Sequence, residues 1–286
     1  MFKQMSTKKK MICVLVGIFF ILIIWTAWGN TALELNTYTI RSRELPDAFD
    51  GYRIALVSDL HNAEFGNGNQ RLLDMLRKAE PDMIAITGDL IDSRKINIAV
   101  ALGFAEEAVQ IAPCYYVSGN HEARVSEYQK LKTGLEAAGV TVLDDTQVKI
   151  DISGESITII GVNDPSFSAD YLTGDAAVID RKLSELAAED ASFTVLLSHR
   201  PELFDTYVNH DMDLILSGHA HGGQFRLPLI GGLIAPNQGL FPKYDAGLYS
   251  EGNTNMIVSR GLGNSIIPIR FNNRPEVVLI ELASQN

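Results

Sequence analysis

Cysteine is scarce in this sequence, which has only two among 286 residues. Cys13 lies in a long apolar run near the N-terminus, whereas Cys114 lies in a segment expected to form a strand. Because these two positions are not expected to meet, the sequence excludes a disulfide-stabilised scaffold, which needs several cysteine pairs. Cys114 is most simply a small core residue.

Basic residues are also few, with 24 Lys and Arg against 35 Asp and Glu, for a net charge of -11. Four lysines fall in the first ten residues, which contain no acid, so the chain from Met11 onward holds 20 basic and 35 acidic side chains. Nucleic-acid binding is dominated by cationic contacts to phosphate. The acidic body therefore argues against a nucleic-acid partner.

Charge is absent altogether from residues 11–28, which form a single apolar run. A run of 18 residues is at the lower edge of what crosses a bilayer as a helix. Trp25 and Trp28 lie at its outer end, where tryptophan favours the membrane interface. The lysines that precede the run are expected to stay in the cytoplasm, which places the rest of the chain outside.

A cleaved signal peptide starts in the same way, but its apolar core usually spans about 7–15 residues. Residues 27–29, Ala-Trp-Gly, make a poor cleavage site, and no twin-arginine pair is present. We therefore favour an uncleaved signal-anchor, with cleavage as the alternative. The expected organisation is a cytoplasmic basic tail at residues 1–10, a transmembrane signal-anchor at 11–28, a juxtamembrane lead-in at 29–50 and one extracytoplasmic domain at 51–286.

Strands and helices alternate in the first half of this domain. Apolar, β-rich runs predict strands at residues 52–57, 83–87 and 114–117, and amphipathic patterns predict helices at 67–80, 98–111 and 126–138. This alternation indicates an α/β fold. Further strands are expected at 35–41, 140–143, 148–152, 157–161, 193–197, 214–216, 254–258, 266–269 and 277–282, with helices at 176–188 and from Pro201. Residues 221–246 show no clear period, and a loop of that length is usually functional.

Side chains that bind metals recur where these strands end. In Ser58-Asp59-Leu60-His61, a carboxylate and an imidazole follow a strand and can turn toward one point. His121 also follows a strand, whereas His210 lies near a helix end and is expected to be structural or solvated. Because sites in parallel-type sheets gather at the carboxyl ends of strands, one edge is expected to hold Asp59, His61, Asp89, Asn120, His199, His219 and His221.

These ligands suffice for two divalent metal ions. Carboxylates, imidazoles and one amide oxygen suit Mn, Fe or Zn better than calcium. Asp89 is the natural candidate for a carboxylate that bridges the two cations. Three glycines beside the ligands, Gly88, Gly119 and Gly218, are expected to let the backbone turn sharply there.

Together these motifs resemble the signature of the calcineurin-like metallophosphoesterases, here as Asp59-x-His61, Gly88-Asp89, Gly119-Asn120-His121-Glu122, His199 and Gly218-His219-x-His221. Their order matches, and the resemblance covers roughly residue 54 to the C-terminus. The anchor, Gly222-Gly223-Gln224 and residues 235–239 resemble the bacterial, membrane-anchored YkuE/YaeI-type branch. The resemblance implies an α/β fold with a two-layer β core, a β-sandwich, flanked by helices and preceded by the transmembrane helix.

The resemblance also implies how the ligands divide. One cation would be held by Asp59, His61 and His221, and the other by Asn120, His199 and His219, with Asp89 bridging both. The implied reaction is hydrolysis of a phosphoester, most simply a phosphodiester at the outer face of the membrane, by attack of a metal-bridging hydroxide. His121 is the candidate for protonating the leaving oxygen, with Asp59 as the group that orients it.

The sequence leaves the substrate open. Membrane attachment favours a lipid or envelope-derived phosphoester, and the apolar side chains of residues 225–241 could line an acyl-chain site, touch the bilayer or simply pack on the core. A lipid pyrophosphatase of the UDP-2,3-diacylglucosamine type and a non-catalytic metal-binding sensor are the alternatives. Three arginines near the motifs are expected to form salt bridges rather than bind phosphate: Arg200, Arg226 and Arg260.

Overall fold

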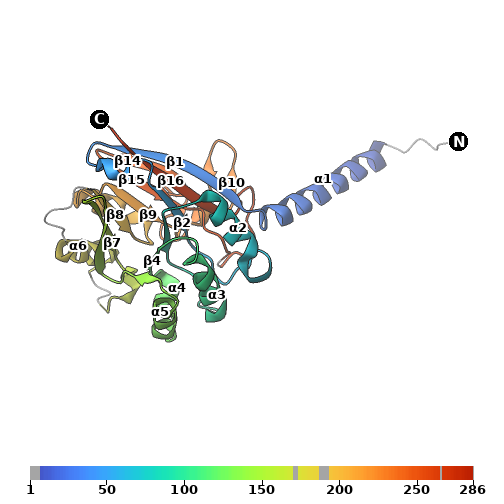
Figure 1. The fold of residues 1–286 in the computed structure, drawn as a ribbon. Coiled ribbons are helices and arrows are strands. Elements are labelled where there is room, and N and C mark those ends of the chain that lie inside the picture. Colours follow the sequence, from blue (N-terminus) through green and yellow to red (C-terminus); the bar gives the residue numbers. More distant parts are fainter. Residues whose placement is uncertain (1–6, 170–172, 187–192, 265, 286) are drawn as a thin grey trace.

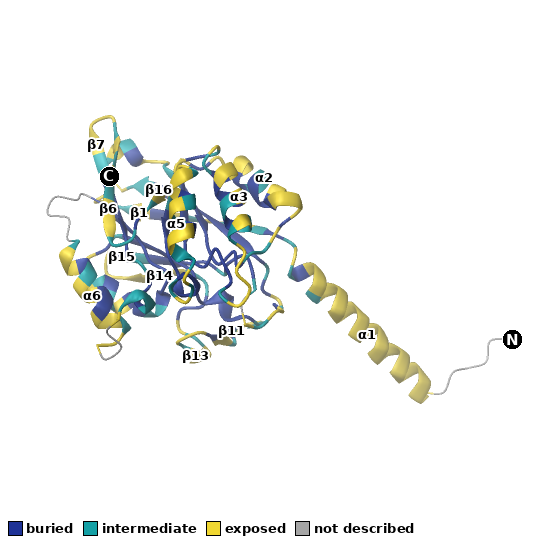
Figure 2. Cartoon of the chain, turned by 90° about the horizontal axis from the view of Figure 1, so that it is seen from below, coloured by how far each residue is buried: buried dark blue, intermediate teal, exposed yellow. Residues whose placement is uncertain are grey.

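A long helix and a body of two large sheets make up the part of the chain that the structure describes (Figure 1). The structure, a computed structural model, describes residues 7–169, 173–186, 193–264 and 266–285. Helix α1 (Thr7–Gly29) projects from the body and is exposed along nearly its whole length (Figure 2). It is long and apolar enough to cross a membrane, and it contains the whole of the uncharged run.

The first sheet is mixed, with six strands in the order β1-β16-β2-β3-β4-β5. Its strands are β1 (Glu34–Ser42), β2 (Arg53–Val57), β3 (Met83–Thr87), β4 (Cys114–Val117), β5 (Thr141–Val142) and β16 (Glu276–Ser284). Strands β2 to β5 are parallel, whereas β16 runs antiparallel to β2 and parallel to the edge strand β1. The last strand of the chain therefore lies between the first two.

The second sheet is also mixed, in the order β14-β15-β9-β8-β7-β6. Its strands are β6 (Thr146–Ile152), β7 (Glu155–Gly161), β8 (Thr194–Leu197), β9 (Leu214–Ser217), β14 (Gly247–Glu251) and β15 (Thr254–Val258). The four central strands are parallel, and the edge strands β6 and β14 run antiparallel to their neighbours. Of these strands, only β14 has no counterpart among those predicted.

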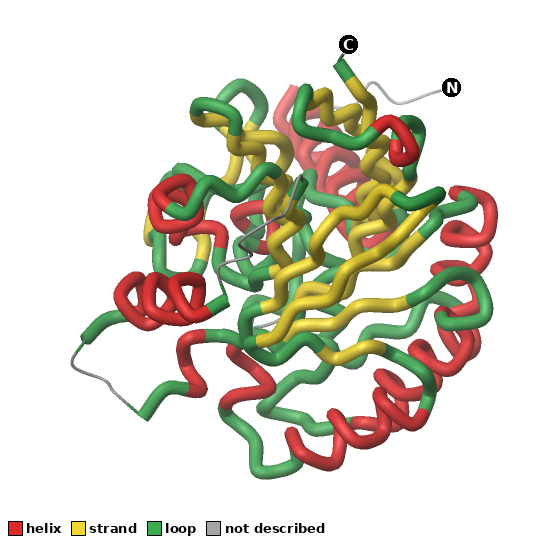
Figure 3. The backbone as a smooth tube through the Cα atoms, turned by 60° about the vertical axis from the view of Figure 1, so that its left-hand side comes forward, coloured by secondary structure: helices red, strands yellow, loops and turns green. Residues whose placement is uncertain are grey.

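Helices cover the outer faces of both sheets (Figure 3). Helices α2 (Gln70–Ala79), α3 (Ile98–Ala108) and α5 (Tyr128–Ala137) pack on the first sheet, and α6 (Asp175–Glu185) and α7 (Phe204–Asn209) pack on the second. A single short turn of helix, α4 (Asn120–Ala123), follows β4. The predicted helices are confirmed with somewhat shorter bounds, although residues 187 and 188 of the helix predicted at 176–188 lie outside the described residues.

Strand β2 shows why the central strands are apolar along their whole length. Ile54 and Leu56 pack between the two sheets, in one cluster with residues of β8 and β9 such as Val195. Ala55 and Val57 face the other way and pack under α2 and α3. Because side chains alternate along a strand, a strand between two layers must be apolar on both faces. The expected two-layer β core flanked by helices is confirmed.

Two small hairpins occupy much of the segment that shows no period in the sequence. They are formed by β10 (Arg226–Leu227) with β11 (Gly231–Gly232) and by β12 (Ile234–Ala235) with β13 (Gly239–Leu240).

The strand predicted at residues 266–269 is wrong, because none of these four described residues lies in a strand. Pro268 has no N–H to offer a ladder. The carbonyl oxygens of Ile267 and Ile269 instead accept hydrogen bonds from Nε2 of Gln224, at 2.8 and 2.7 Å. The side chain of Gln224, just before the first hairpin, thus takes the place of a partner strand.

Candidate metal centre

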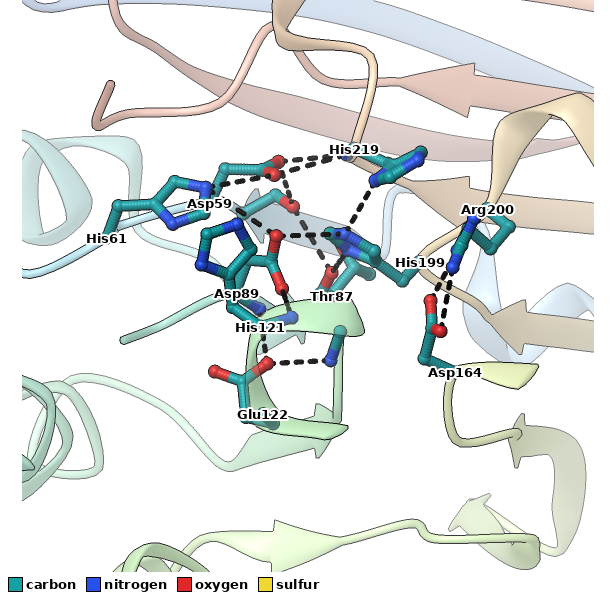
Figure 4. A network of polar contacts seen from close by, with 12 residues as sticks. Asp59, His61, Thr87, Asp89, His121, Glu122, Asp164, His199, Arg200 and His219 are labelled. Atoms are coloured by element: carbon teal, nitrogen blue, oxygen red, sulfur yellow. Dashed lines mark hydrogen bonds and ion pairs between the residues drawn. The ribbon is translucent and has the colours of Figure 1, made fainter. Parts of the chain in front are cut away.

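The ends of five strands meet at one place (Figure 4). The first sheet contributes the residues that follow β2, β3 and β4, and the second sheet contributes those that follow β8 and β9. Each of the residues predicted for the site lies there and is buried: Asp59, His61, Asp89, Asn120, His121, His199, His219 and His221. The centre therefore joins the two sheets.

Five of these residues have a left-handed backbone, although none of them is glycine. The φ angle is 54° at Asp59, 45° at His61, 53° at Asp89, 65° at His219 and 48° at His221. This region costs about 1–2 kcal/mol for a residue with a side chain. Strain of this kind gathers at functional sites, where the surrounding structure enforces it. The backbone after β2, β3 and β9 is thus strained, and this strain lowers the stability of the protein.

The glycines beside the ligands are needed for two different reasons. Gly88 has a φ of 85°, which glycine adopts without strain, so it makes the sharp turn that was expected. Gly119 has an extended backbone, but a Cβ there would collide with Oδ1 of Asp89. In the same way, a Cβ on Gly218 would collide with Oγ of Ser58. At these two positions glycine is needed for close approach.

Asp59, His61 and His221 form one group of candidate ligand atoms. Nε2 of His61 lies 3.1 Å from Nε2 of His221. Oδ1 of Asp59 lies 3.7 Å from the first of these nitrogens and 3.4 Å from the second. All three ligand atoms are therefore close enough to share a single cation.

Asp89, His199 and His219 form a second group. Nε2 of His199 lies 3.2 Å from Oδ2 of Asp89 and 3.2 Å from Nδ1 of His219. The same Oδ2 lies 3.6 Å from Nε2 of His61, which belongs to the first group. The carboxylate of Asp89 therefore lies between the two groups.

The nitrogen and oxygen atoms of the second group can face a common cation. Nδ1 of His199 lies 2.7 Å from the carbonyl oxygen of Thr87, which can only accept, so Nδ1 carries the proton and Nε2 offers its lone pair. The side-chain oxygen of Asn120 faces acceptors, whereas its nitrogen in that place would donate to Nδ1 of His219 at 2.9 Å. A cation would take the oxygen of Asn120 as a ligand, whereas the reversed amide, with its oxygen on Arg124, needs none. The buried His and Asp clusters are thus consistent with a dinuclear metal site.

The charges in the centre favour ionised carboxylates. Burial opposes ionisation of Asp89, but the imidazoles of His199 and His61 outweigh it and hold the pKa of Asp89 well below its usual range. Burial also opposes a charge on His199, yet Asp89 raises the pKa of His199 to about 10, so a cation that binds Nε2 displaces a proton from it. At His221 burial prevails over the attraction of Asp59 and lowers the pKa to about 3. Carboxylate ligands are therefore available across the physiological range of pH.

His121 lies against this centre and has its own partners. One ring nitrogen lies within 4.8 Å of ligand atoms of His61 and Asp89. Nδ1 accepts a hydrogen bond from the backbone N–H of Ser93 at 3.0 Å and lies 3.7 Å from Oδ1 of Asp92. Ser93 therefore orients Nδ1, and the role predicted for Asp59 stays a prediction. Because Nδ1 accepts, the neutral ring carries its proton on Nε2.

Glu122 received no role from the sequence, yet it holds the loops after β3 and β4 together. Oε2 accepts hydrogen bonds from the N–H groups of Asp89 and Gly119, both at 2.8 Å, and Oε1 accepts one from Ile91 at 3.2 Å. Burial raises the pKa of Glu122 to about 7 even though these N–H groups favour its charge. The only signal in the sequence was its place directly after Asn120 and His121.

The arginines near the centre form ion pairs, as expected. The guanidinium of buried Arg200 contacts both carboxylate oxygens of Asp164 and also Glu202. The other two pair with acids outside the centre, Arg226 with Asp245 and Arg260 with Glu276. Their charges are largely matched within the protein.

Known proteins resemble this chain over most of its length. Residues 52–223 match the calcineurin-like phosphoesterase family. The uncharacterized metallophosphoesterase YkuE of Bacillus subtilis is 30% identical over 89% of this chain and 87% of its own, and the phosphodiesterase YaeI of Escherichia coli is 29% identical over 81% and 82%. The crystal structure of TT1561 of Thermus thermophilus shares the fold, with a TM-score of 0.52 at 15% identity over 74% of this chain and 90% of that one.

Replacing Glu122 should destabilise the protein and weaken metal binding together. In Glu122→Ala three buried N–H groups lose their acceptor, and an unsatisfied buried group costs about 1–3 kcal/mol. The midpoint of urea unfolding and the apparent metal affinity should both fall, with partial recovery in Glu122→Gln, which keeps one acceptor oxygen. Glu136→Ala, at an exposed site on α5, is the control. An unchanged unfolding midpoint in Glu122→Ala would refute this role.

Proposed function

The chain belongs to the calcineurin-like phosphoesterase family, and from this premise we propose that it is a phosphodiesterase that uses two divalent cations at the outer face of a membrane. Metal-dependent phosphoester hydrolysis follows from the family and from the buried clusters. The preference for diesters rests on the likeness to YaeI, which is named a phosphodiesterase. The observation that carries the proposal is the position of Asp89 between two groups of ligand atoms.

We assign the ligands by these two groups. Asp59, His61 and His221 would hold one cation, and Asn120, His199 and His219 would hold the other. Asp89 would contact both, because its Oδ2 lies within 3.6 Å of a nitrogen from each group. Mixed carboxylate, imidazole and amide ligands favour Mn, Fe or Zn.

The cations, when bound, supply Lewis acidity toward the phosphoryl oxygens and lower the pKa of water to about 7. The chain supplies a proton donor in His121. Burial lowers the pKa of His121 to about 4, so the ring is neutral at physiological pH with its proton on Nε2. We assign this N–H to the leaving oxygen, to which it donates a hydrogen bond. This assignment refines the predicted role of His121 as the group that protonates that oxygen.

The orientation in the membrane follows from the charges beside helix α1. Lysines 8–10 lie at its N-terminal end and no basic residue lies in its last turn. Segments rich in lysine stay in the cytoplasm, so the body and its metal centre would lie outside.

Substrate preference and metal binding can be tested on the full chain in detergent. With Mn²⁺ it should hydrolyse an aryl phosphodiester faster than the matching monoester, and chelation should abolish both rates. His221→Ala should lose turnover and bind about one cation fewer. Apart from the shared Asp89, only Asp59 and His61 would remain to hold the first cation. His210→Ala, whose imidazole contacts Asp180, is the control. Equal rates on the two esters, or unchanged metal content in His221→Ala, would contradict the respective assignment.

Loss of His121 should separate chemistry from metal binding. His121→Ala should lower kcat by about 10²–10³-fold, the usual contribution of one hydrogen bond to developing negative charge, while the metal content stays normal. Initial rates and elemental analysis of the same preparations measure the two effects. A parallel fall in metal content and turnover would mean that His121 supports the metal site instead.

The orientation predicts which side of the membrane an introduced thiol can reach. In cells that express the chain, Glu136→Cys on the exposed face of α5 should react with a membrane-impermeant maleimide without lysis. Lys9→Cys should react only after lysis, and the native thiols offer little background because Cys114 is buried and Cys13 lies in the apolar run. The reverse pattern would place the catalytic body in the cytoplasm.

A further inference from the structure

An apolar cavity lies directly beside the metal centre. Its volume is about 260 Å³, and His221 forms one wall. The remaining lining comes from Gln224, from the second hairpin and from the residues wrongly predicted to form a strand. These lining residues are Gln224, Ile234, Ala235, Pro236, Ile266 and Ile267. A group attached to a phosphate at the centre could therefore enter this cavity past His221.

The chemistry of the lining identifies the kind of group that fits. Nε2 of Gln224 is already engaged by the carbonyl oxygens of Ile267 and Ile269, so it has little to offer a ligand. The other lining residues, apart from His221, present hydrocarbon, and none of them is aromatic. A nucleoside or sugar would lose hydrogen bonds to water without replacement here. A hydrocarbon group loses nothing comparable, and an apolar cavity of about 150 Å³ already binds benzene.

Exposed apolar side chains lie on the cavity wall and on the two small hairpins. Ile266, which lines the cavity, is 72% exposed. Leu240, which pairs with the lining residue Ile234, is 65% exposed, and the next residue, Phe241, is 61% exposed. Leu229, between the strands of the first hairpin, is fully exposed. A soluble surface rarely gathers so many large apolar residues unless it contacts another apolar phase.

This surface lies on the side of the body that faces the anchor. The backbone of Arg270 exchanges two hydrogen bonds with the side chain of Asn30, both at 2.8 Å, directly after helix α1. The guanidinium of Arg274 also stacks on Trp28, at 4.9 Å from the ring. The hairpin strands lie on the same side as the base of α1 (Figures 1 and 2). A bilayer crossed by α1 would therefore meet the mouth of the cavity.

We propose that the substrate is an amphiphilic phosphoester whose hydrocarbon chain enters this cavity from the membrane while its phosphate reaches the metal centre. The inference rests on the proposed phosphodiesterase function and adds the class of substrate. Leu229, Leu240, Phe241 and Ile266 contact the lipid surface, and Ala235 and Ile267 contact the chain.

Kinetics on a matched pair of substrates test the cavity. The full chain in phosphatidylcholine nanodiscs should prefer 4-nitrophenyl dodecyl phosphate over 4-nitrophenyl ethyl phosphate by at least about tenfold in kcat/KM, because each buried methylene adds to binding. Ala235→Phe, which fills the cavity, should bring this ratio close to one, and Ile266→Asn at the exposed rim should lower it. Ile96→Asn, at an exposed site outside the cavity, should keep the ratio of the unaltered chain.

The outcomes separate this inference from the proposed function. Hydrolysis of both esters with no preference, or a preference that Ala235→Phe leaves unchanged because it comes only from partitioning, would overturn the chain site and leave the phosphodiesterase standing. Hydrolysis of neither ester would overturn the proposed function alone.

Photolabelling tests the site without requiring turnover. Dodecyl phosphate with a diazirine at the end of its chain should label residues 234–236 and 266–267 of the full chain in nanodiscs, as read by peptide mass spectrometry. Ala235→Phe should suppress this labelling. Labelling confined to helix α1, or unaffected by Ala235→Phe, would overturn the inference whatever the kinetics show.

Discussion

The buried carboxylate of Asp89 is the constraint on which the rest of the structure depends. Its Oδ1 accepts a hydrogen bond from the backbone of His121, and its Oδ2 lies 3.2 Å from Nε2 of His199. Its own N–H donates to Glu122, and its carbonyl oxygen accepts from the N–H of His61. One residue thus ties together the ends of β2, β3, β4 and β8. A buried carboxylate that lost these partners would be strongly destabilising, so the two sheets and the centre form one unit.

The residues that meet at the centre could be predicted from the sequence because their positions follow a local pattern. Each lies two to four residues after an apolar strand, and β2 to β4, β8 and β9 end where the apolar runs end. Contacts between segments far apart in the sequence leave no comparable local pattern. The sequence did not show that β16 inserts between β1 and β2, nor that Ser93 would orient His121. The strand predicted at 266–269 failed because a run of isoleucines looks the same whether a strand or a glutamine side chain satisfies its carbonyls.

The connection between helix α1 and the body is polar, and it leads toward the centre. Asn30 binds the backbone of Arg270, whose guanidinium is fully buried and lies 3.3 Å from Nδ1 of His221. Burial lowers the pKa of Arg270 to about 10, against the attraction of Asp59, so its charge persists at physiological pH. The segment that carries Arg270 also supplies Ile266 and Ile267 to the cavity wall. A bilayer that held helix α1 would therefore also set the height of the cavity mouth above the lipid.

A hydrocarbon wall next to a charged centre also bears on the reaction itself. Electrostatic stabilisation of a transition state is stronger where water is excluded, because the local dielectric is lower. A soluble phosphoester would leave water in the cavity beside His221, whereas a hydrocarbon chain would displace it. Binding energy from the remote, unreactive part of the substrate would then act on the reacting centre, which raises turnover as well as affinity. The cavity would in this way favour an amphiphilic ester both in binding affinity and in the stability of the transition state.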